Sequence, residues 1–156
     1  MTSTPRKSKS LDTAQRIAAI VEGIAGCPTR ATLKPNVDIK RINDREISVW
    51  PESRAVGFKS RELNQVDMQI GICVLERMPP TEDEDILGDD LLHLVETIGE
   101  QFIGAQIETD DDDLESTLHC LGYTHEPLYD RDFLETARIF GAGIFLSLQR
   151  HEVRVT

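Results

Sequence analysis

Apolar residues alternate with polar ones in the middle of the chain and again near its end. Residues 66–75 carry Val, Met or Ile at every second position, which predicts a long strand with one apolar face throughout. Residues 138–150 are apolar or glycine at nearly every position as far as 148, which predicts a strand covered on both faces. Two shorter alternating runs, 47–49 before Pro51 and 117–123, predict two more strands.

Two other segments space their apolar residues three and four apart, as helices do. Ser10 can cap a helix whose apolar stripe runs through residues 11–25 and stops at Gly26. A second stripe runs through residues 87–103. One further helical turn is predicted at residues 132–136.

These elements follow one another in the order α-β-β-α-β-β and predict an α+β fold. We expect a mostly antiparallel or mixed four-stranded sheet packed against two main helices. The charged segment Glu52–Asn64 is interpreted as a loop between the first two strands. A chain of 156 residues has the size of one domain, so we expect a single α/β domain, 10–156, after a flexible basic extension, 1–9.

Charge is divided along the chain. Fifteen of the 28 Asp and Glu residues lie between Glu76 and Glu115, where Arg77 is the only Lys or Arg. Residues 1–75 instead carry 12 basic and 8 acidic groups. A chain with separate basic and acidic surfaces can be complementary to another copy of itself, whereas an acidic surface repels nucleic acid.

The composition argues against several classes of protein. Eight aromatic residues and a net charge of -11 do not suit a protein that stacks bases or binds phosphates. Cys27, Cys73 and Cys120 are odd in number, far apart and without a CxxC pair, which favours a reducing compartment over a disulfide framework or a zinc ribbon. No apolar run reaches the roughly 18 residues of a membrane span, so we expect no membrane contact.

Candidate metal and catalytic sites are weak. The acidic runs lack the alternating carboxylates and central Gly of a calcium loop. His119, Cys120 and His125 are zinc-ligand types, but neighbours in a strand point to opposite faces, so a structural His and a buried Cys are favoured. No nucleophile elbow, metalloprotease motif or P-loop occurs. We expect no enzymatic activity, no metal and no cofactor.

Residues suited to contact a partner lie around the first strand. Trp50, the only tryptophan, is either part of the core or an interface anchor, because Trp and Arg often dominate binding energy. Arg54, Lys59 and Arg61 make the following segment basic. We interpret that segment as a partner for the acidic band of a neighbouring copy.

From Ile47 onward the order of local features resembles the tail terminator, or tail completion, proteins of long-tailed bacteriophages. The resemblance covers residues 40–150. It is carried by a strand ending in Val49-Trp50-Pro51, the pair Ser53-Arg54, the strand 65–75, the helix residues 91–98, the turn Glu126-Pro127-Leu128-Tyr129, the segment Phe133-Leu134-Glu135 and the strand 138–148.

The resemblance implies a structural subunit of the virion that assembles into a ring, in the best-known cases a hexamer. Such a ring sits at the head-proximal end of the tail tube, stops tube polymerisation and joins the tail to the head. The implied partners are further copies of the chain, the tail tube protein and a head-tail connector or neck protein, with assembly in the host cytoplasm. Residues assigned to a subunit or partner interface are Trp50, Arg54, Lys59, Arg61, Glu126 and Tyr129.

An acidic lining would let DNA pass through the bore of such a ring without binding to it. We expect either the turn Glu82–Asp90 or the loop Glu108–Glu115 to face this lumen. The candidate residues are Glu82, Asp83, Glu84, Asp85, Asp110, Asp111, Asp112 and Asp113. Three alternatives stay open: a neck or head-closure connector of the same virion, a small cytosolic metal-dependent enzyme, and an acidic mimic of DNA.

Overall fold

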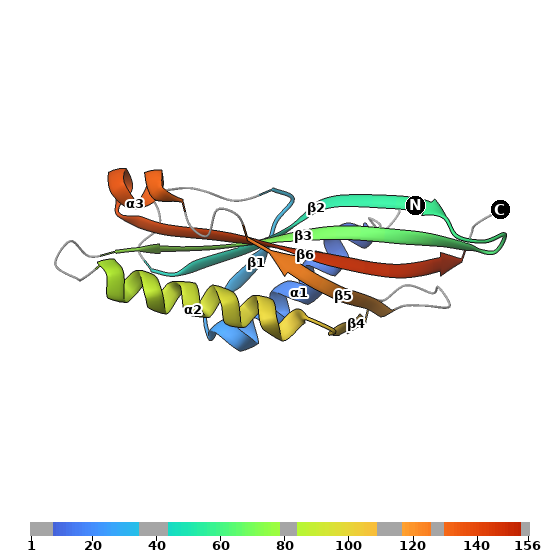
Figure 1. The fold of residues 1–156 in the computed structure, drawn as a ribbon, viewed down its shortest axis with the longest axis horizontal. Coiled ribbons are helices and arrows are strands. Elements are labelled where there is room, and N and C mark those ends of the chain that lie inside the picture. The colour runs from blue at the N-terminus through green and yellow to red at the C-terminus, as the bar shows by residue number, and fades with distance from the viewer. Residues whose placement is uncertain (1–7, 35–43, 79–83, 109–116, 126–129, 154–156) are drawn as a thin grey trace, which may run out of the picture.

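The computed structural model describes residues 8–34, 44–78, 84–108, 117–125 and 130–153 (Figure 1). In these ranges it shows an α+β fold with one mixed six-stranded sheet in the order β1-β2-β3-β6-β5-β4. β1 runs parallel to β2, and every other pairing in the sheet is antiparallel. The elements are α1 (Lys9–Ala25), β1 (Thr29–Ala31), β2 (Glu46–Phe58), β3 (Leu63–Arg77), α2 (Glu84–Phe102), β4 (Gln106–Glu108), β5 (Thr117–Thr124), α3 (Arg131–Ala137) and β6 (Ile139–Val153).

The two long central strands, β3 and β6, follow the predicted alternation. Ile70 lies opposite Leu146 and Ile72 opposite Ile144, and these four side chains are at most 1% exposed. Burying an aliphatic side chain of this size stabilises a fold by about 1.5–3 kcal/mol. The strands predicted at 66–75, 117–123 and 138–150 are confirmed as parts of β3, β5 and β6.

Helices α1 and α2 pack on the same face of the sheet (Figure 1). α1 contacts β1 and β2 near one edge and β4 at the other, while α2 contacts β5, β6 and α1. The sheet therefore curls around the helices, which bury the apolar stripes that their spacing predicts. The core-facing helix residues include Ile17, Val21, Val95, Ile98 and Phe102.

The start of α1 differs from the sequence prediction. Ser8, not Ser10, is the N-cap: its hydroxyl accepts the Leu11 N–H at 3.0 Å, one turn ahead. Lys9, which the sequence assigns to the basic extension, therefore belongs to the helix. The predicted end is confirmed, since Gly26 has a φ of 68° and donates its N–H to Glu22 O at 2.9 Å.

The prediction of a loop from Glu52 to Asn64 is wrong. β2 continues through Pro51 to Phe58, β3 begins at Leu63, and only four residues join them. The strand continues because the pairing register shifts between Pro51 and Ser53, and because β1 pairs only with residues 47–49 of β2. Proline is tolerated at such a bulge near a sheet edge, where its missing N–H costs no ladder hydrogen bond.

The predicted four strands, and their order, are also wrong. β1 and β4 have three residues each, too few for alternation to reveal. α3 extends the predicted helical turn at 132–136. α2 begins at Glu84, so Glu84 and Asp85 belong to its first turn and not to a turn before it. None of the helices in the described ranges combines the length and apolar character needed to cross a membrane.

Candidate subunit interface

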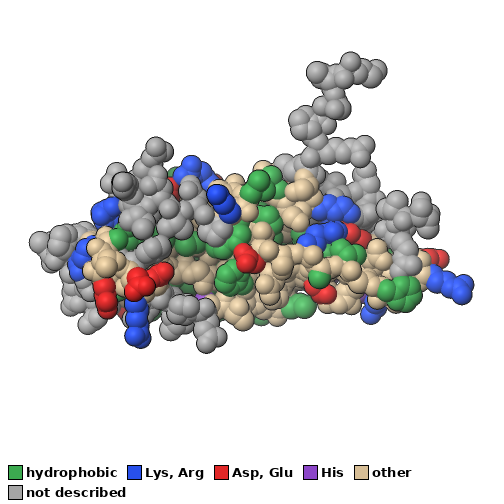
Figure 2. All heavy atoms as spheres, turned by 90° about the horizontal axis from the view of Figure 1, so that it is seen from above, with side chains coloured by type: hydrophobic (Ala, Val, Ile, Leu, Met, Phe, Trp, Pro, Cys, Tyr) green, Lys and Arg blue, Asp and Glu red, His purple; other side chains and the backbone are tan. Residues whose placement is uncertain are grey.

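Trp50 lies opposite Gly71 of β3 and alternates with Val49, which belongs to the core under α1 and α2, so its side chain lies on the other sheet face. Figure 2 views the molecule from that face and shows apolar side chains along its middle. Its indole covers Gly71 of β3, where an added Cβ would lie 2.3 Å from the ring. It also meets Phe145 edge to face, with the ring centroids 6.2 Å apart, and its Nε1–H donates to Glu52 Oε2 at 2.7 Å. Trp50 is only 5% exposed. The structure thus uses it in packing, and a role in binding a partner stays a prediction.

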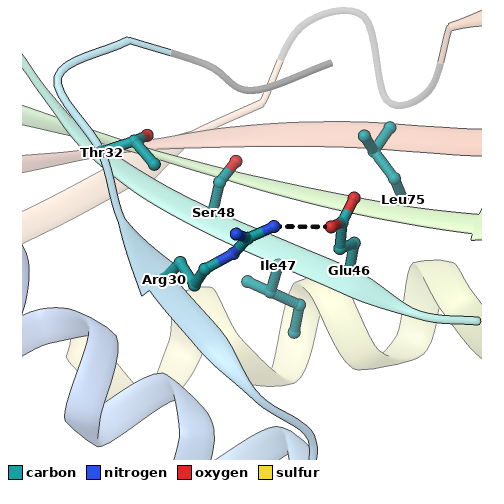
Figure 3. Close-up of a pocket in the computed structure, with 6 residues that line it drawn as sticks. All are labelled: Arg30, Thr32, Glu46, Ile47, Ser48 and Leu75. Carbon is teal, nitrogen blue, oxygen red and sulfur yellow. Dashed lines mark hydrogen bonds and ion pairs between the residues drawn. The ribbon is translucent and has the colours of Figure 1, made fainter. Parts of the chain in front are cut away.

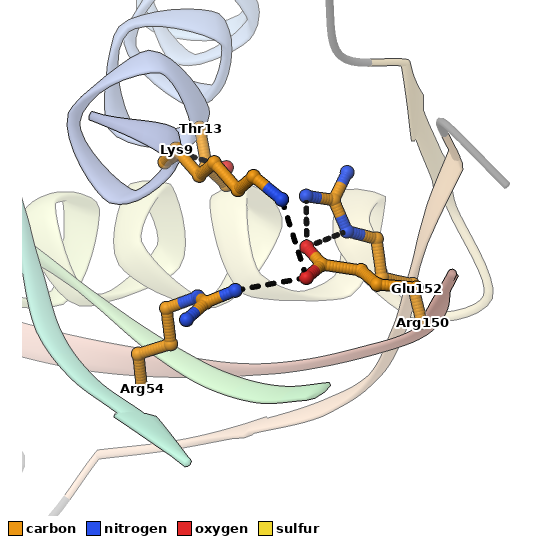
Figure 4. Close-up of polar contacts among 5 residues, drawn as sticks. All are labelled: Lys9, Thr13, Arg54, Arg150 and Glu152. Atoms are coloured by element: carbon orange, nitrogen blue, oxygen red, sulfur yellow. Dashed lines mark hydrogen bonds and ion pairs between the residues drawn. The ribbon is translucent and has the colours of Figure 1, made fainter. Parts of the chain in front are cut away.

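Arg54 turns toward the helix side of the sheet and joins a charged cluster (Figure 4). Glu152 Oε2 accepts hydrogen bonds from Arg54 Nη2 at 3.0 Å and from Lys9 Nζ at 3.3 Å, while its Oε1 accepts one from Arg150 Nε at 2.9 Å. The Arg150 side chain is 0% exposed and that of Glu152 is 7% exposed. One carboxylate therefore links the first turn of α1, β2 and β6.

The pKa of Glu152 reflects two opposing effects. Burial alone would raise this pKa, but the hydrogen bond and charge of Arg150, with the charges of Lys9 and Arg54, outweigh burial and lower it. Sequence reasoning missed this cluster. The signal was present, since Arg150 and Glu152 continue the alternation of the buried positions Leu146 and Leu148.

Residues 56–62 form the end of the β2–β3 hairpin, the hairpin tip. Lys59 N–H donates to Leu63 O at 3.2 Å and closes the turn. Val56 is 47% exposed and Phe58 72% exposed, and the side chains of Lys59 and Arg61 are exposed. Neither cation forms an ion pair within the part of the chain that the structure describes. The tip therefore combines apolar and positive surface.

Helix α2 supplies the opposite charge. It contains six Asp or Glu residues and no Lys or Arg. Asp89, Asp90, Glu96 and Glu100 are exposed, and none of these four forms an ion pair in the described ranges. Burial raises the pKa of Tyr123, and the nearby charges of Glu100 and Glu96 raise it further. Most of the described carboxylates between Glu76 and Glu115 thus lie on α2, while Glu76 lies on β3 and Glu108 on β4.

Several predicted interface and lumen residues lie outside the described part of the chain. Glu126 and Tyr129 lie outside the described residues, as do Glu82, Asp83 and the run Asp110–Asp113. Of the predicted interface residues that are described, the structure brings Lys59 and Arg61 together at the hairpin tip. Trp50, which is buried in β2, and Arg54, which donates a hydrogen bond to Glu152, lie outside this tip.

A shallow depression between β1 and β2 offers little for a ligand (Figure 3). Its cavity volume of about 10 Å³ leaves room for about one water molecule and is far below the roughly 300–1,000 Å³ of ordinary ligand pockets. Arg30 Nη2 donates to Glu46 Oε1 at 2.9 Å across it. Its lining residues are Arg30, Thr32, Glu46, Ile47, Ser48 and Leu75.

The cysteines are poorly suited to nucleophilic chemistry. Burial is the main cause that raises the pKa of all three thiols, and it raises that of Cys73, with help from Asp130, to about 11. A protonated thiol is a weak nucleophile. Across the described ranges, no three His, Cys, Asp or Glu side chains gather in a way that could hold a metal ion.

Solved structures resemble this chain, whereas family models and curated proteins do not. No family model matches it, and no curated protein matches it either. One solved structure, whose title states no function, resembles it with a TM-score of 0.41 and 10% sequence identity, over 93% of this chain and 92% of the other. A likeness this weak carries no argument about fold family or function.

Proposed function

We propose that the chain is a ring-forming structural subunit of a bacteriophage virion. In this proposal the ring sits at the head-proximal end of the tail tube, stops tube polymerisation and joins the tail to the head. The observation that carries the proposal is the pair of oppositely charged surfaces on one small domain. Lys59 and Arg61 at the hairpin tip, and Glu96 and Glu100 on α2, form no ion pairs in the described ranges.

Such a charge division suits assembly into a ring. Two different surfaces on one subunit make a head-to-tail contact, which closes into a ring when the rotation between copies permits. Complementary charge contributes orientation and speed of association more than affinity. The proposed action is therefore assembly and not turnover, and it requires no metal or cofactor.

The same division suits a bore through which DNA passes. α2 is acidic along its length, with Glu84 and Asp85 in its first turn. In the proposal the N-terminal end of α2 lies toward the lumen. Like charges there would keep the phosphate backbone from binding.

Mass measurement in solution tests this function most directly. We expect a particle whose mass is a small multiple of 17.5 kDa, and which caps one end of purified tail tubes of the same virion in electron micrographs. A mass of one chain, both alone and with tubes, would overturn the proposal. Labelled antibody on intact virions would separate a ring on the tube from a connector nearer the capsid.

A further inference from the structure

Leu121 is a large apolar side chain at a β-bulge. The pairing of β5 with β6 passes from Cys120–Leu148 to Gly122–Ser147, so Leu121 is the inserted residue, and it is 61% exposed. Bulges are a means by which a sheet re-aims a side chain. A single exposed leucine needs no explanation, but this one has an exposed apolar neighbour.

Ile103 lies at the same corner of the molecule as Leu121. Gly104 N–H donates to Cys120 O at 3.0 Å, so the end of α2 runs alongside the bulge. Ile103 is 56% exposed, and Glu100, three residues earlier on α2, is exposed as well. Ile103, Leu121 and Glu100 form the corner patch, in which two apolar side chains are bordered by an anion.

The segment that follows β1 presents the complementary side chains. Thr32 N–H donates to Val49 O at 2.8 Å, and the Thr32 hydroxyl donates to Lys34 O at 2.6 Å, so this segment is held against β2. Leu33 lies between these hydrogen bonds and is 74% exposed, and Lys34 is also exposed. Leu33 and Lys34 form the β1 patch, in which one apolar side chain is bordered by a cation.

We propose that the β1 patch of one copy docks on the corner patch of the next copy. Leu33 packs between Ile103 and Leu121. Lys34 faces Glu100, and neither of these charges forms an ion pair within the described ranges. This contact rests on the proposed function, because it names surfaces that join subunits of the ring. The occupant of the corner patch is a second copy, since the apolar side chain and the cation that complement it are exposed on this same chain.

The two patches lie at opposite edges of the sheet. β1 is the first strand in the sheet order, whereas β5 and β4 are the last two. The high exposure of Leu33 and Leu121 shows that the patches do not cover each other within one copy. A contact between two different surfaces is head-to-tail, the kind that generates rings. Leu33 supplies the buried apolar area, and the ion pair sets the direction of approach, because exposed ion pairs contribute little affinity.

Opposite charges introduced on the two patches test the proposal. We expect Leu33→Glu and Leu121→Lys each to weaken ring assembly at least about tenfold, because each replaces a contact leucine by a charged side chain. Assembly should recover when the two variants are mixed in equal amounts, since their contacts then join either two unchanged patches or the introduced carboxylate and ammonium groups. Sedimentation at several concentrations gives the assembly constants.

Ile20 provides matched control variants. It lies on α1, outside both patches, and is 41% exposed. We expect Ile20→Glu and Ile20→Lys to assemble as the wild type does, and urea denaturation to show the same stability in all four variants. Equal losses of assembly in these controls would show a general effect of surface charge and would overturn the assigned contact.

Cross-linking gives a second test that does not depend on affinity. Mixing the single variants Leu33→Cys and Ile103→Cys should give a disulfide-linked pair of chains under mild oxidation, whereas mixing Leu33→Cys with Ile20→Cys should not. A wild type that assembles while neither leucine substitution weakens assembly and no cross-link forms overturns this contact and leaves the ring standing. Substitutions that spare self-assembly but abolish tube capping also overturn it, since the occupant is then the tube protein. A wild type that is monomeric alone and with tubes overturns both proposals.

Discussion

Gly71 shows how a missing side chain shapes the outer face of the sheet. An added Cβ would lie 2.3–2.4 Å from two atoms of the Trp50 ring, so the indole would have to leave Gly71 and its hydrogen bond to Glu52. Overpacking of this kind costs about 1–3 kcal/mol. We expect Gly71→Ala to lower the free energy of unfolding by that amount, measured by urea denaturation.

Gly143 on β6 provides the matched control for Gly71. It lies opposite Cys73, two residues along β3 from Gly71, and therefore on the same sheet face. The nearest atom to a Cβ there is Ile72 O at 3.7 Å, which is ordinary contact. We expect Gly143→Ala to change stability by less than about 0.5 kcal/mol. Equal losses at both glycines would show that the strands, and not Trp50, resist the added methyl group.

Glu152 should make stability depend on pH. Its pKa in the fold lies below the usual 4.5: burial opposes this, but Arg150, Lys9 and Arg54 prevail. A carboxyl of this kind stabilises the fold above its unfolded pKa, and the stabilisation is lost as the pH falls through the folded pKa. We expect Glu152→Gln to cost about 3 kcal/mol at pH 7, since Arg150 stays buried without its counter-charge.

The difference between wild type and Glu152→Gln should shrink once the pH falls below 4.5 and vanish below the folded pKa. Urea denaturation of both proteins from pH 7 to pH 3 measures this difference. The control is Glu135→Gln, which removes an exposed carboxylate of α3 outside the cluster and should leave stability unchanged throughout. A constant difference for Glu152→Gln would show that side-chain shape, and not charge, holds the cluster together.

Packing of α2 on β5 depends on a second glycine. A Cβ at Gly99 would lie 2.7 Å from the Tyr123 ring, whereas one at Gly88 meets nothing within 4 Å. Replacing a helix glycine by alanine stabilises a helix by about 1 kcal/mol when nothing obstructs it. We expect Gly88→Ala to raise the thermal midpoint and Gly99→Ala to lower it. If both raised it, Tyr123 would be moving aside at no cost.

Sequence patterns predict the long elements of this fold because burial repeats along them. β3 and β6 bury every second residue over much of their length, so their periodicity is plain. β1 and β4, with three residues each, are defined by pairing with distant strands, which no local pattern records. Pro51 wrongly predicted the end of a strand. A proline destabilises a strand where its missing N–H would bond to a neighbouring strand, and β1 pairs only with residues 47–49 of β2.

The candidate interface was only partly predictable, for related reasons. Composition identifies Lys59 and Arg61 as cations of a basic segment, but the exposure of Val56 and Phe58 depends on where the helices stop covering the sheet. Arg54 resembles its basic neighbours in the sequence, yet the register of β2 turns it toward Glu152, a residue 98 positions away. Ion pairs between residues far apart in the sequence can be predicted only once the strand register is known.

In the molecule as a whole, the buried apolar core and the exposed charges occupy different regions. The core holds α1 inside the curled sheet, and the apolar residues there form one continuous cluster. The exposed charges of the hairpin tip and α2 lie outside this core and take no part in it. Changes to these charges should therefore alter association between copies while leaving the fold of each copy intact.

Salt should weaken the proposed association of copies but not abolish it. Screening reaches about 10 Å at 0.1 M ionic strength and about 3 Å at 1 M, so exposed charges attract one another less as salt rises. Apolar contacts in the proposed ring are not screened. We expect the assembly constant, measured by sedimentation, to fall between 0.05 M and 0.5 M sodium chloride in the wild type. The Lys59→Glu/Arg61→Glu variant should show the opposite trend, because screening relieves its repulsion from α2. Salt-independent assembly of the wild type would mean that apolar contacts alone hold the copies together and that the charge division serves only the bore.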